Sequence, residues 1–243
     1  MKSKLIQILA NILHFFRWFL TVIRNHAFPT TSHRRYLIAY NKYEIEEMEK
    51  CYQHFKKYFP AAIFLEKNIQ EYSIKKAREK DVGDSGLYIE FGVFKGTTIN
   101  ILSKFVKKIY GFDSFEGLKD DWNGFQNHPK GTFDLKKKLP KLNKNVTTVV
   151  GWVQDTLEPF LKESDQKIIF VHLDLDTFES TKFVLLKIKP RLVKGSVILF
   201  DQLYNYPGWE GGEYKAMTEV FNENEYRFLM FSKIGEQAAI EIL

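Results

Sequence analysis

The stretch that decides the fold is LYIEFGVFKGTTIN, residues 87–100. A short apolar run ends at Glu90, glycines follow at positions 92 and 96, and a helix-like segment begins at Thr97. This order predicts a strand, a tight turn and a helix N-terminus, where free backbone N–H groups can hold an anionic group. Gly92 would let the chain turn or let a ligand come close, and Gly96 would let the helix pack on the strand.

The spacing of this turn separates it from the best-known nucleotide sites. The pattern is E-x-G-x-x-x-G, not the G-x-G-x-x-G with which a backbone embraces the pyrophosphate of a dinucleotide. Two glycines near a strand end are also compatible with a turn that has only a structural role. The motif therefore needs support from elsewhere in the chain.

The next apolar run supplies that support. Residues 108–112 (KIYGF) end in Asp113, which follows Glu90 by 23 residues. In a doubly wound sheet, an acid about 20 residues beyond the first turn lies at the tip of the neighbouring strand and can accept ribose hydroxyls. The alternative is that Asp113 only caps the following segment. Acidic strand tips without a phosphate loop suit S-adenosylmethionine, whose amino-acid end is a zwitterion.

Composition and charge exclude several classes of protein. The only cysteine, Cys51, excludes an intramolecular disulfide and a cysteine-cluster metal site, and it indicates a reducing compartment. The net charge is +6, but residues 1–43 hold seven lysines and arginines and no acid, so residues 44–243 carry −1. Because the basic excess belongs to an N-terminal segment, we do not predict nucleic-acid binding.

The N-terminal segment is basic and apolar. Residues 1–25 predict a helix, but Arg17 and His14 in its middle argue against a membrane span, and no cleavage pattern of a signal peptide follows. Peripheral contact with a membrane and packing on the domain or in a homo-oligomer both remain open. We expect a linker at 26–42 and a helical part at 43–80, with one helix at 43–59 and another at 61–80.

Strand and helix patterns alternate over residues 81–243. Apolar runs lie at 87–90, 108–112, 146–150, 167–173, 196–200, 226–231 and 237–242. This alternation predicts an α/β fold with a doubly wound, mostly parallel sheet of seven strands. No helix pattern separates the last two runs, so we expect them to form a hairpin with one antiparallel strand. The long polar stretch at 114–133, which contains Phe115, Trp122, Phe125 and Phe133, is predicted to be a lid.

Acids follow two strands that should be neighbours in this sheet. Asp174 follows the fourth strand and Asp201 the fifth, so their carboxylates could meet at the edge where ligands bind. Two carboxylates so close repel each other unless one is protonated or a cation lies between them, and the side-chain oxygen of Gln202 could be a third ligand of Mg2+. Asp176 is free to act as a base. The alternative is that Asp174, Asp176 and Thr177 cap the following helix.

Five blocks of the sequence resemble a known family. They are EFGVFKG (90–96), FDSFEGL (112–118), GWVQDTLEPF (151–160), HLDLDTFESTK (172–182) and PRLVKGSVILFD (190–201). Together they resemble the macrocin O-methyltransferase (TylF) family of class I S-adenosylmethionine-dependent methyltransferases, which methylate sugar hydroxyls. The resemblance covers the chain from about Ile69 onward. It implies the sheet order 3-2-1-4-5-7-6 with strand 7 antiparallel.

The resemblance also implies roles for individual residues. Asp174, Asp201 and Gln202 would hold Mg2+, and Asp176 would be the general base. Gln202 departs from the acid that is usual there and leaves one fewer negative charge, so weaker binding of Mg2+ is expected. The residues expected to bind the cofactor are Glu90, Gly92, Lys95, Gly96, Thr97, Asp113, Ser114, Phe115, Gly151 and Trp152.

The sequence thus predicts an S-adenosylmethionine-dependent O-methyltransferase, assisted by Mg2+, that acts on a sugar or another polyhydroxy acceptor, either a small molecule or a glycan. Two alternatives stay open: a metal-independent methyltransferase of small molecules, and a catalytically silent protein of the same fold that binds membrane surfaces. We expect a cytoplasmic protein, with residues 1–25 as a route to the inner face of the membrane.

Overall fold

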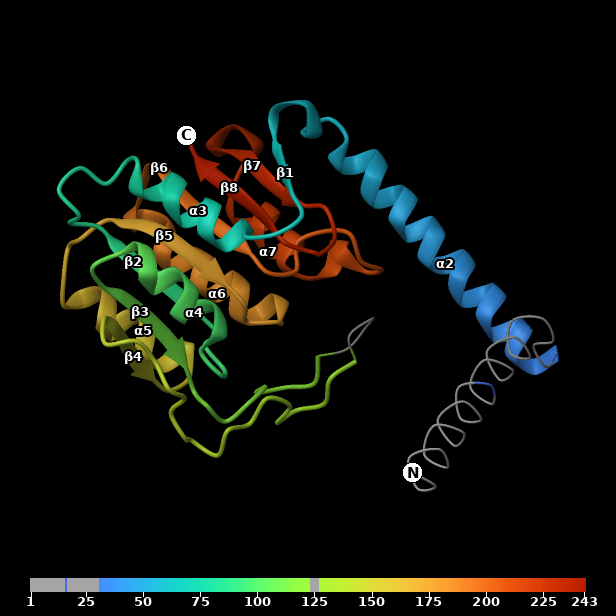
Figure 1. Cartoon of the computed structure of the whole chain (residues 1–243), viewed down its shortest axis with the longest axis horizontal. Helices are drawn as coiled ribbons and strands as arrows, with labels where there is room; N and C mark the ends of the chain where they lie inside the picture. The colour runs from blue at the N-terminus through green and yellow to red at the C-terminus, as the bar shows by residue number, and fades with distance from the viewer. Residues whose placement is uncertain (1–15, 17–30, 123–126) are drawn as a thin grey trace, which may run out of the picture. The chain divides into compact units, whose positions relative to one another are not determined.

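The computed structural model describes residue 16, residues 31–122 and residues 127–243 (Figure 1). The helix predicted at 1–25, except for Phe16, lies outside these described residues, as do residues 26–30 of the predicted linker and Phe125 of the predicted lid. The chain divides into two compact units, residues 1–46 and residues 47–243. No helix among the described residues combines the length and the hydropathy needed to cross a membrane.

The first described helix corrects the expected linker. Helix α2 runs over Thr31–Phe55, so residues 31–42 are helical. No glycine or proline lies between Thr31 and Phe55, and nothing in the sequence interrupts the helix after Pro29. In the second unit, the end of α2 contributes Cys51 and Phe55 to the hydrophobic core.

The prediction of a single helix at 61–80 is also wrong. The segment forms a short 3-10 helix η1 (Phe59–Ala61), a strand β1 (Ile63–Leu65) and a helix α3 (Ile69–Arg78). The apolar residues Ile63–Leu65 pair in parallel with strand β7, and Asn68 adopts a positive φ of 64° directly before α3. A three-residue strand is too short to show a period of two, so the pattern could not distinguish it from the helix that follows.

The sheet has eight strands, one more than predicted. Its order is β1-β7-β8-β6-β5-β2-β3-β4, so β1 adds a strand at one edge, and β8 is antiparallel to both of its neighbours. The remaining strands are β2 (Leu87–Phe91), β3 (Ile109–Asp113), β4 (Val146–Val150), β5 (Ile168–Leu173), β6 (Leu192–Phe200), β7 (Tyr226–Ser232) and β8 (Ala238–Ile242).

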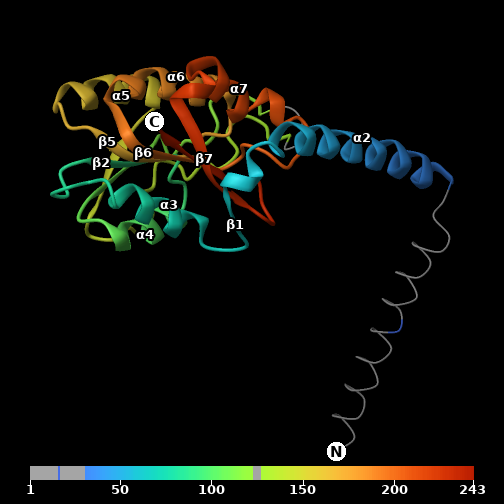
Figure 2. The same ribbon diagram turned by 90° about the horizontal axis from the view of Figure 1, so that it is seen from above.

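Helices cover both faces of the sheet, as Figure 2 shows. Helices α3 and α4 (Thr97–Leu102) lie on one face, and α5 (Val153–Lys162), α6 (Phe178–Ile188) and α7 (Glu213–Val220) lie on the other. Short 3-10 helices complete the chain at η2 (Ser103–Phe105), η3 (Lys189–Arg191), η4 (Trp209–Gly211) and η5 (Glu223–Glu225). The architecture is therefore the expected Rossmann-like, doubly wound α/β fold.

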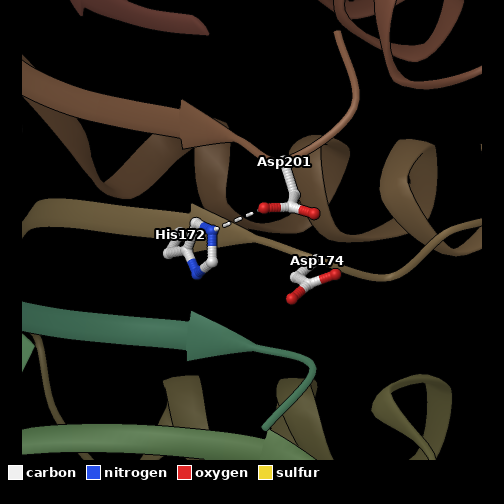
Figure 3. Close-up of side chains that lie close together, drawn as sticks. All are labelled: His172, Asp174 and Asp201. Atoms are coloured by element: carbon white, nitrogen blue, oxygen red, sulfur yellow. Dashed lines mark ion pairs between the residues drawn. The ribbon is translucent and has the colours of Figure 1, made fainter. Parts of the chain in front are cut away.

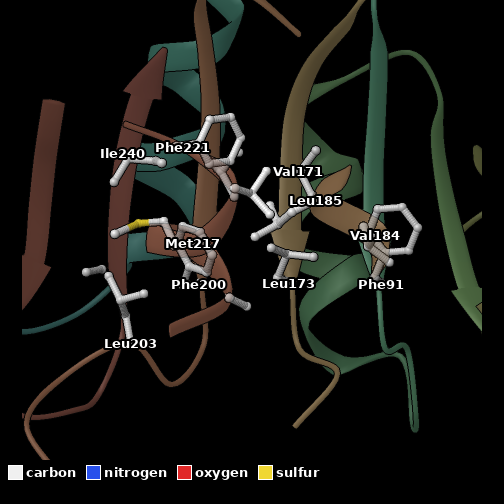
Figure 4. Packing of buried hydrophobic residues seen from close by; sticks show 14 of the residues in the cluster. Phe91, Val171, Leu173, Val184, Leu185, Phe200, Leu203, Met217, Phe221 and Ile240 are labelled. Carbon is white, nitrogen blue, oxygen red and sulfur yellow. The ribbon is translucent and has the colours of Figure 1, made fainter. Parts of the chain in front are cut away.

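The core holds the carboxyl ends of the central strands in register. Every residue of β2 and of β5 is buried, as expected for parallel strands with helices on both faces. Figure 4 shows Val171 and Leu173 of β5 packed with Phe200 of β6 and with Leu185 of α6. Leu173 pairs with Phe200, so the residues after these two strands, Asp174 and Asp201, emerge side by side.

Candidate active site

A cavity of about 560 Å³ opens at the carboxyl ends of the parallel strands. It is lined by the segments that follow β2, β3, β4, β5 and β6, which is where open α/β sheets bind ligands. The predicted site residues that line it are Gly92, Asp113, Ser114, Gly151, Trp152, Asp174, Asp176 and Gln202. The predicted residues outside the lining are Glu90, Lys95, Gly96, Thr97, Phe115 and Asp201.

Gly92 brings the ends of β2 and β5 together. Its φ is +91°, and a Cβ at this position would lie 1.8 Å from the backbone oxygen of Asp174. The backbone N–H of Asp174 donates to the carbonyl of Phe91 at 2.9 Å. Only glycine fits here, because the turn needs a left-handed φ and the neighbouring strand leaves no room for a side chain.

Asp113 holds this turn in place. Its Oδ2 accepts hydrogen bonds from the backbone N–H groups of Val93 (2.8 Å) and Phe94 (2.7 Å), and its Oδ1 accepts one from that of Phe115 (2.7 Å). Asp113 therefore ties the end of β3 to the turn after β2. A carboxylate oxygen can accept two hydrogen bonds, so Oδ1 keeps one acceptor position for a ligand.

Several residues predicted to touch the cofactor lie elsewhere. Glu90 is only 1% exposed, and its Oε2 lies 3.3 Å from Nδ1 of His172 inside the sheet. Phe115 is buried in the hydrophobic core, and Lys95 and Thr97 are exposed outside the cavity lining. These residues lie in or around the turn after β2, but their side chains do not line the cavity.

Asp174 and Asp201 meet beside His172, as the order of their strands predicted (Figure 3). One side-chain ligand atom from each of the three residues lies within 4.8 Å of the other two, and Nε2 of His172 lies 3.7 Å from Oδ1 of Asp201. Burial, together with the charge of Asp201, raises the pKa of Asp174 well above its usual value. Burial acts in the same direction on Asp201, but His172 and the hydrogen bond from Gln237 together outweigh it and hold the pKa of Asp201 below normal.

The amide of Gln202 joins Asp201 to the predicted base. Nε2 of Gln202 donates to Oδ2 of Asp201 at 3.0 Å, and the Gln202 side chain also acts on Asp176, whose pKa it lowers. Asp176 itself has a positive φ of 63°, a conformation that Asp tolerates better than most residues. Burial, with a contribution from the charge of Asp201, raises the pKa of Asp176 to about 7.

The donor set fits a hard divalent cation. Asp174 and Asp201 supply carboxylates, and Oε1 of Gln202 is buried and has no hydrogen-bond partner among the described residues. Mg2+ prefers such oxygen ligands. The competing contacts are on Asp201, whose Oδ1 accepts a hydrogen bond from Nε2 of Gln237 and whose Oδ2 accepts one from Gln202.

Two features of the site were missed by the sequence interpretation. Glu213 is 1% exposed, its Oε2 accepts a hydrogen bond from the backbone N–H of Gln202 at 2.8 Å, and burial raises its pKa well above normal. In the sequence, Glu213 is an ordinary acid in the first turn of a helix, so no pattern distinguishes it. The second missed feature is the part that Phe94 and His128 play in the cavity wall.

The described parts of the predicted lid form one side of the cavity. Glu116 pairs with Asp134 and Trp122 pairs with His128 in two isolated antiparallel bridges, which bring the two arms of the segment together. Trp122, His128 and Phe133 line the cavity. Backbone hydrogen bonds thus hold the two arms to each other beside the cavity.

Comparisons with known proteins agree with this architecture. Residues 89–203 match the family model described as "Methyltransferase domain". A solved structure of CalS11, a calicheamicin methyltransferase, is 24% identical over 71% of this chain and 76% of its own, with a TM-score of 0.57. An apo structure of CalS11, described as a TDP-rhamnose 3'-O-methyltransferase, has the same identity and coverage and a TM-score of 0.51. No curated protein sequence matches the chain.

The fold is that of S-adenosylmethionine-dependent methyltransferases. Residues 89–203, which match the methyltransferase-domain model, contain the turns after β2, β3, β4 and β5.

Proposed function

We propose that the protein is an O-methyltransferase that uses S-adenosylmethionine to methylate a hydroxyl of a sugar or another polyhydroxy acceptor. One observation carries the proposal: the Asp176 carboxylate and the Gly92 turn line the same cavity. A base and a cofactor turn in one cavity are what transfer of a methyl group to a hydroxyl requires. The macrocin O-methyltransferase family is the narrower family that we propose for the chain.

The cofactor half of the cavity would be formed by the turns after β2, β3 and β4. The backbone around Gly92 would face the amino-acid end, Oδ1 of Asp113 and the Ser114 hydroxyl would face the ribose, and Trp152 would flank the adenine. Lys95, Gly96 and Thr97 would support the turn from outside, and Glu90 would support it from within the sheet. S-Adenosylmethionine, when bound there, supplies an electrophilic methyl group and leaves as S-adenosylhomocysteine.

Asp176 would act on the acceptor. A sugar hydroxyl is a poor nucleophile at neutral pH, and a carboxylate with a pKa of about 7 is well matched to remove its proton. The hydroxyl oxygen forms the new bond to the methyl carbon, the sulfur–methyl bond breaks, and the proton passes to Asp176. Residues 114–122 and 127–133 would exclude water while the reacting atoms align.

Asp174, Asp201 and Gln202 would hold Mg2+ if the reaction uses it. A bound cation would lower the pKa of an acceptor hydroxyl, and Asp176 would then remove its proton more easily. A reaction without metal is favoured by one specific observation: the Gln202 amide donates a hydrogen bond to Asp201 and lowers the pKa of Asp176, so it stabilises the charged form of both carboxylates without a cation. Full turnover in EDTA would support the metal-free reaction, and loss of turnover that Mg2+ restores would support the metal.

The first test is calorimetric titration of the full chain with S-adenosylmethionine, with and without Mg2+. Micromolar binding is expected. Absence of binding in both buffers would contradict the proposed function, and it would assign the Gly92 turn a structural role only.

A further inference from the structure

An aromatic wall borders the cavity on the side of the predicted lid. Its four members are Phe94, Phe133, His128 and Trp122, and all of them line the cavity. The centroids of successive rings are 5.3 Å apart from Phe94 to Phe133, 5.3 Å from Phe133 to His128 and 5.6 Å from His128 to Trp122. The planes of successive rings are inclined by 69°, 59° and 36°, so the row offers separate ring faces, against one of which the C–H face of a sugar ring can pack.

The aromatic wall is fixed in position at both ends. The backbone N–H of Trp122 donates to the carbonyl of His128 at 2.8 Å, and the N–H of His128 donates back at 3.0 Å. At the other end, the N–H of Phe94 donates to Asp113 at 2.7 Å. The wall thus begins at the turn assigned to the cofactor and ends at the cavity rim, so a ligand that packs on it would lie next to the reacting centre.

Acidic side chains outnumber basic ones around the cavity. Acids in its lining are Asp113, Asp120, Asp121, Asp174, Asp176 and Glu179, whereas Lys119 is the only lysine or arginine among the described residues that line it. Within the described part of the chain, no salt bridge joins any of these acids to a lysine or arginine. Asp121 is held in place by the backbone N–H of Lys130, which donates to its Oδ1 at 2.7 Å.

The excess of acidic side chains determines which ligand charges the cavity favours. A cavity lined by one sign of charge attracts the opposite sign and repels its own. A cationic cofactor is therefore favoured, whereas a diphosphate would need several arginines, lysines or free N–H groups to hold it. The cavity offers Lys119, whose Nζ lies 5.8 Å from the centroid of the Trp152 ring, on the side assigned to the cofactor.

We propose that the acceptor is a phosphate-free sugar, either neutral or amine-bearing, that packs on the aromatic wall, and that it is not a nucleoside diphosphate sugar. This inference rests on the proposed function and narrows its substrate class. Trp122 would bind the acceptor directly, and Asp120 and Asp121 at the rim would discriminate against phosphate.

The test uses the full chain and matched acceptors. Transfer of a radiolabelled methyl group from S-adenosylmethionine is measured to methyl rhamnoside, methyl glucoside and glucosamine, and in parallel to TDP-rhamnose and UDP-glucose. Transfer to members of the phosphate-free set alone is expected. Transfer to a nucleotide sugar at an equal or higher kcat/KM would overturn the inference, and so would transfer to none of them by a protein that binds the cofactor. Failure to bind S-adenosylmethionine in calorimetry would instead overturn the proposed function.

Two sets of variants test the named residues. Trp122→Ala should raise the KM of an active acceptor at least tenfold, Trp122→Phe should restore most of the loss, and the Kd of S-adenosylmethionine should stay the same in both. The double variant Asp120→Lys, Asp121→Lys should bind UDP at least tenfold more tightly than the wild type at low salt, and the gain should shrink as salt is added. The double variant Glu163→Lys, Asp165→Lys, at exposed positions outside the cavity lining, makes the same change of net charge and is the control. An equal gain in that control, or no gain in the double variant, would contradict the role of the rim acids.

Discussion

Nε2 of Gln202 lies 3.0 Å from Oδ2 of Asp201, so a neutral amide occupies the position next to the second strand-end carboxylate. The same side chain lowers the pKa of Asp176, and its Oε1 is buried without a partner among the described residues. Gln202 thus links the proposed base to the proposed cation ligands without adding a charge. Replacing this neutral amide by a carboxylate should therefore change the affinity for a cation.

We expect Gln202→Glu to strengthen the binding of Mg2+. A third carboxylate would add a charged oxygen ligand, and a gain of about tenfold in affinity corresponds to about 1.4 kcal/mol. Calorimetric titration with Mg2+, without cofactor, measures this directly. Gln202→Asn, which keeps the amide but shortens its reach, is the control and should not show the gain. Equal affinity in the wild type and in Gln202→Glu would argue that Gln202 is not a ligand.

The turnover of the wild type should rise with pH through the region around 7. Asp176 must lose its proton before it can accept one from the acceptor, and its pKa is about 7. The variant Asp176→Asn should lose about 10²–10⁴-fold in kcat while its Kd for S-adenosylmethionine stays unchanged. Steady-state rates between pH 5.5 and 9 check both statements. A wild-type profile that is flat across this range would remove Asp176 from the role of base.

Asp176→Asn should also alter stability, in a direction set by the same pKa. The folded state raises the pKa of Asp176 from 3.8 to about 7, so the contribution of this one group to stability is complete below pH 4 and is lost as pH rises toward 7. Asn carries no charge and tolerates the positive φ of this position. The variant should therefore melt at a higher temperature than the wild type at pH 8, by about 2–4 °C for each kcal/mol recovered. Thermal melts at pH 4 and pH 8 test this, and a difference that does not grow with pH would contradict it.

Gly92→Ala should cost far more stability than Gly83→Ala. Both glycines have nearly the same φ, +91° and +95°, but a Cβ at Gly92 would lie 1.8 Å from the Asp174 oxygen, whereas nothing lies within 4 Å of one at Gly83. The Gly83 variant measures the cost of φ alone, about 1–2 kcal/mol. Urea denaturation gives the free energy of unfolding of both variants, and the difference between their losses measures the cost of the contact between Gly92 and Asp174. Similar losses in the two would show that the contact with Asp174 relaxes easily.

Much of the fold and part of the site could be predicted from the sequence, for definite physical reasons. The buried strands read as apolar runs, and acids at the ends of neighbouring parallel strands must meet, which placed Asp174 beside Asp201. The strand β1 escaped prediction because three residues show no period. The start of α2 was missed because residues 31–42 lack a strong amphipathic pattern.

The errors in the site have another origin. Spacing along the chain gives the position of a residue on a strand, but it does not give the partner of its side chain. Glu90 lies at a strand tip as expected, yet it is buried against His172. Phe94 and His128 are 34 positions apart, and only the folded chain brings both to the aromatic wall through Phe133.

The added strand β1 has a consequence for self-association. By pairing with β7, as in the contact of Ile63 with Met230, it covers backbone groups that would otherwise form an open sheet edge. The backbone N–H of Lys233 extends this protection by donating to the carbonyl of Leu65 at 2.7 Å. Open edges are templates for pairing with other chains, and very short edge strands are one of the ways in which proteins avoid this. Three residues outside the cavity lining therefore help to keep neighbouring copies of the protein from joining edge to edge.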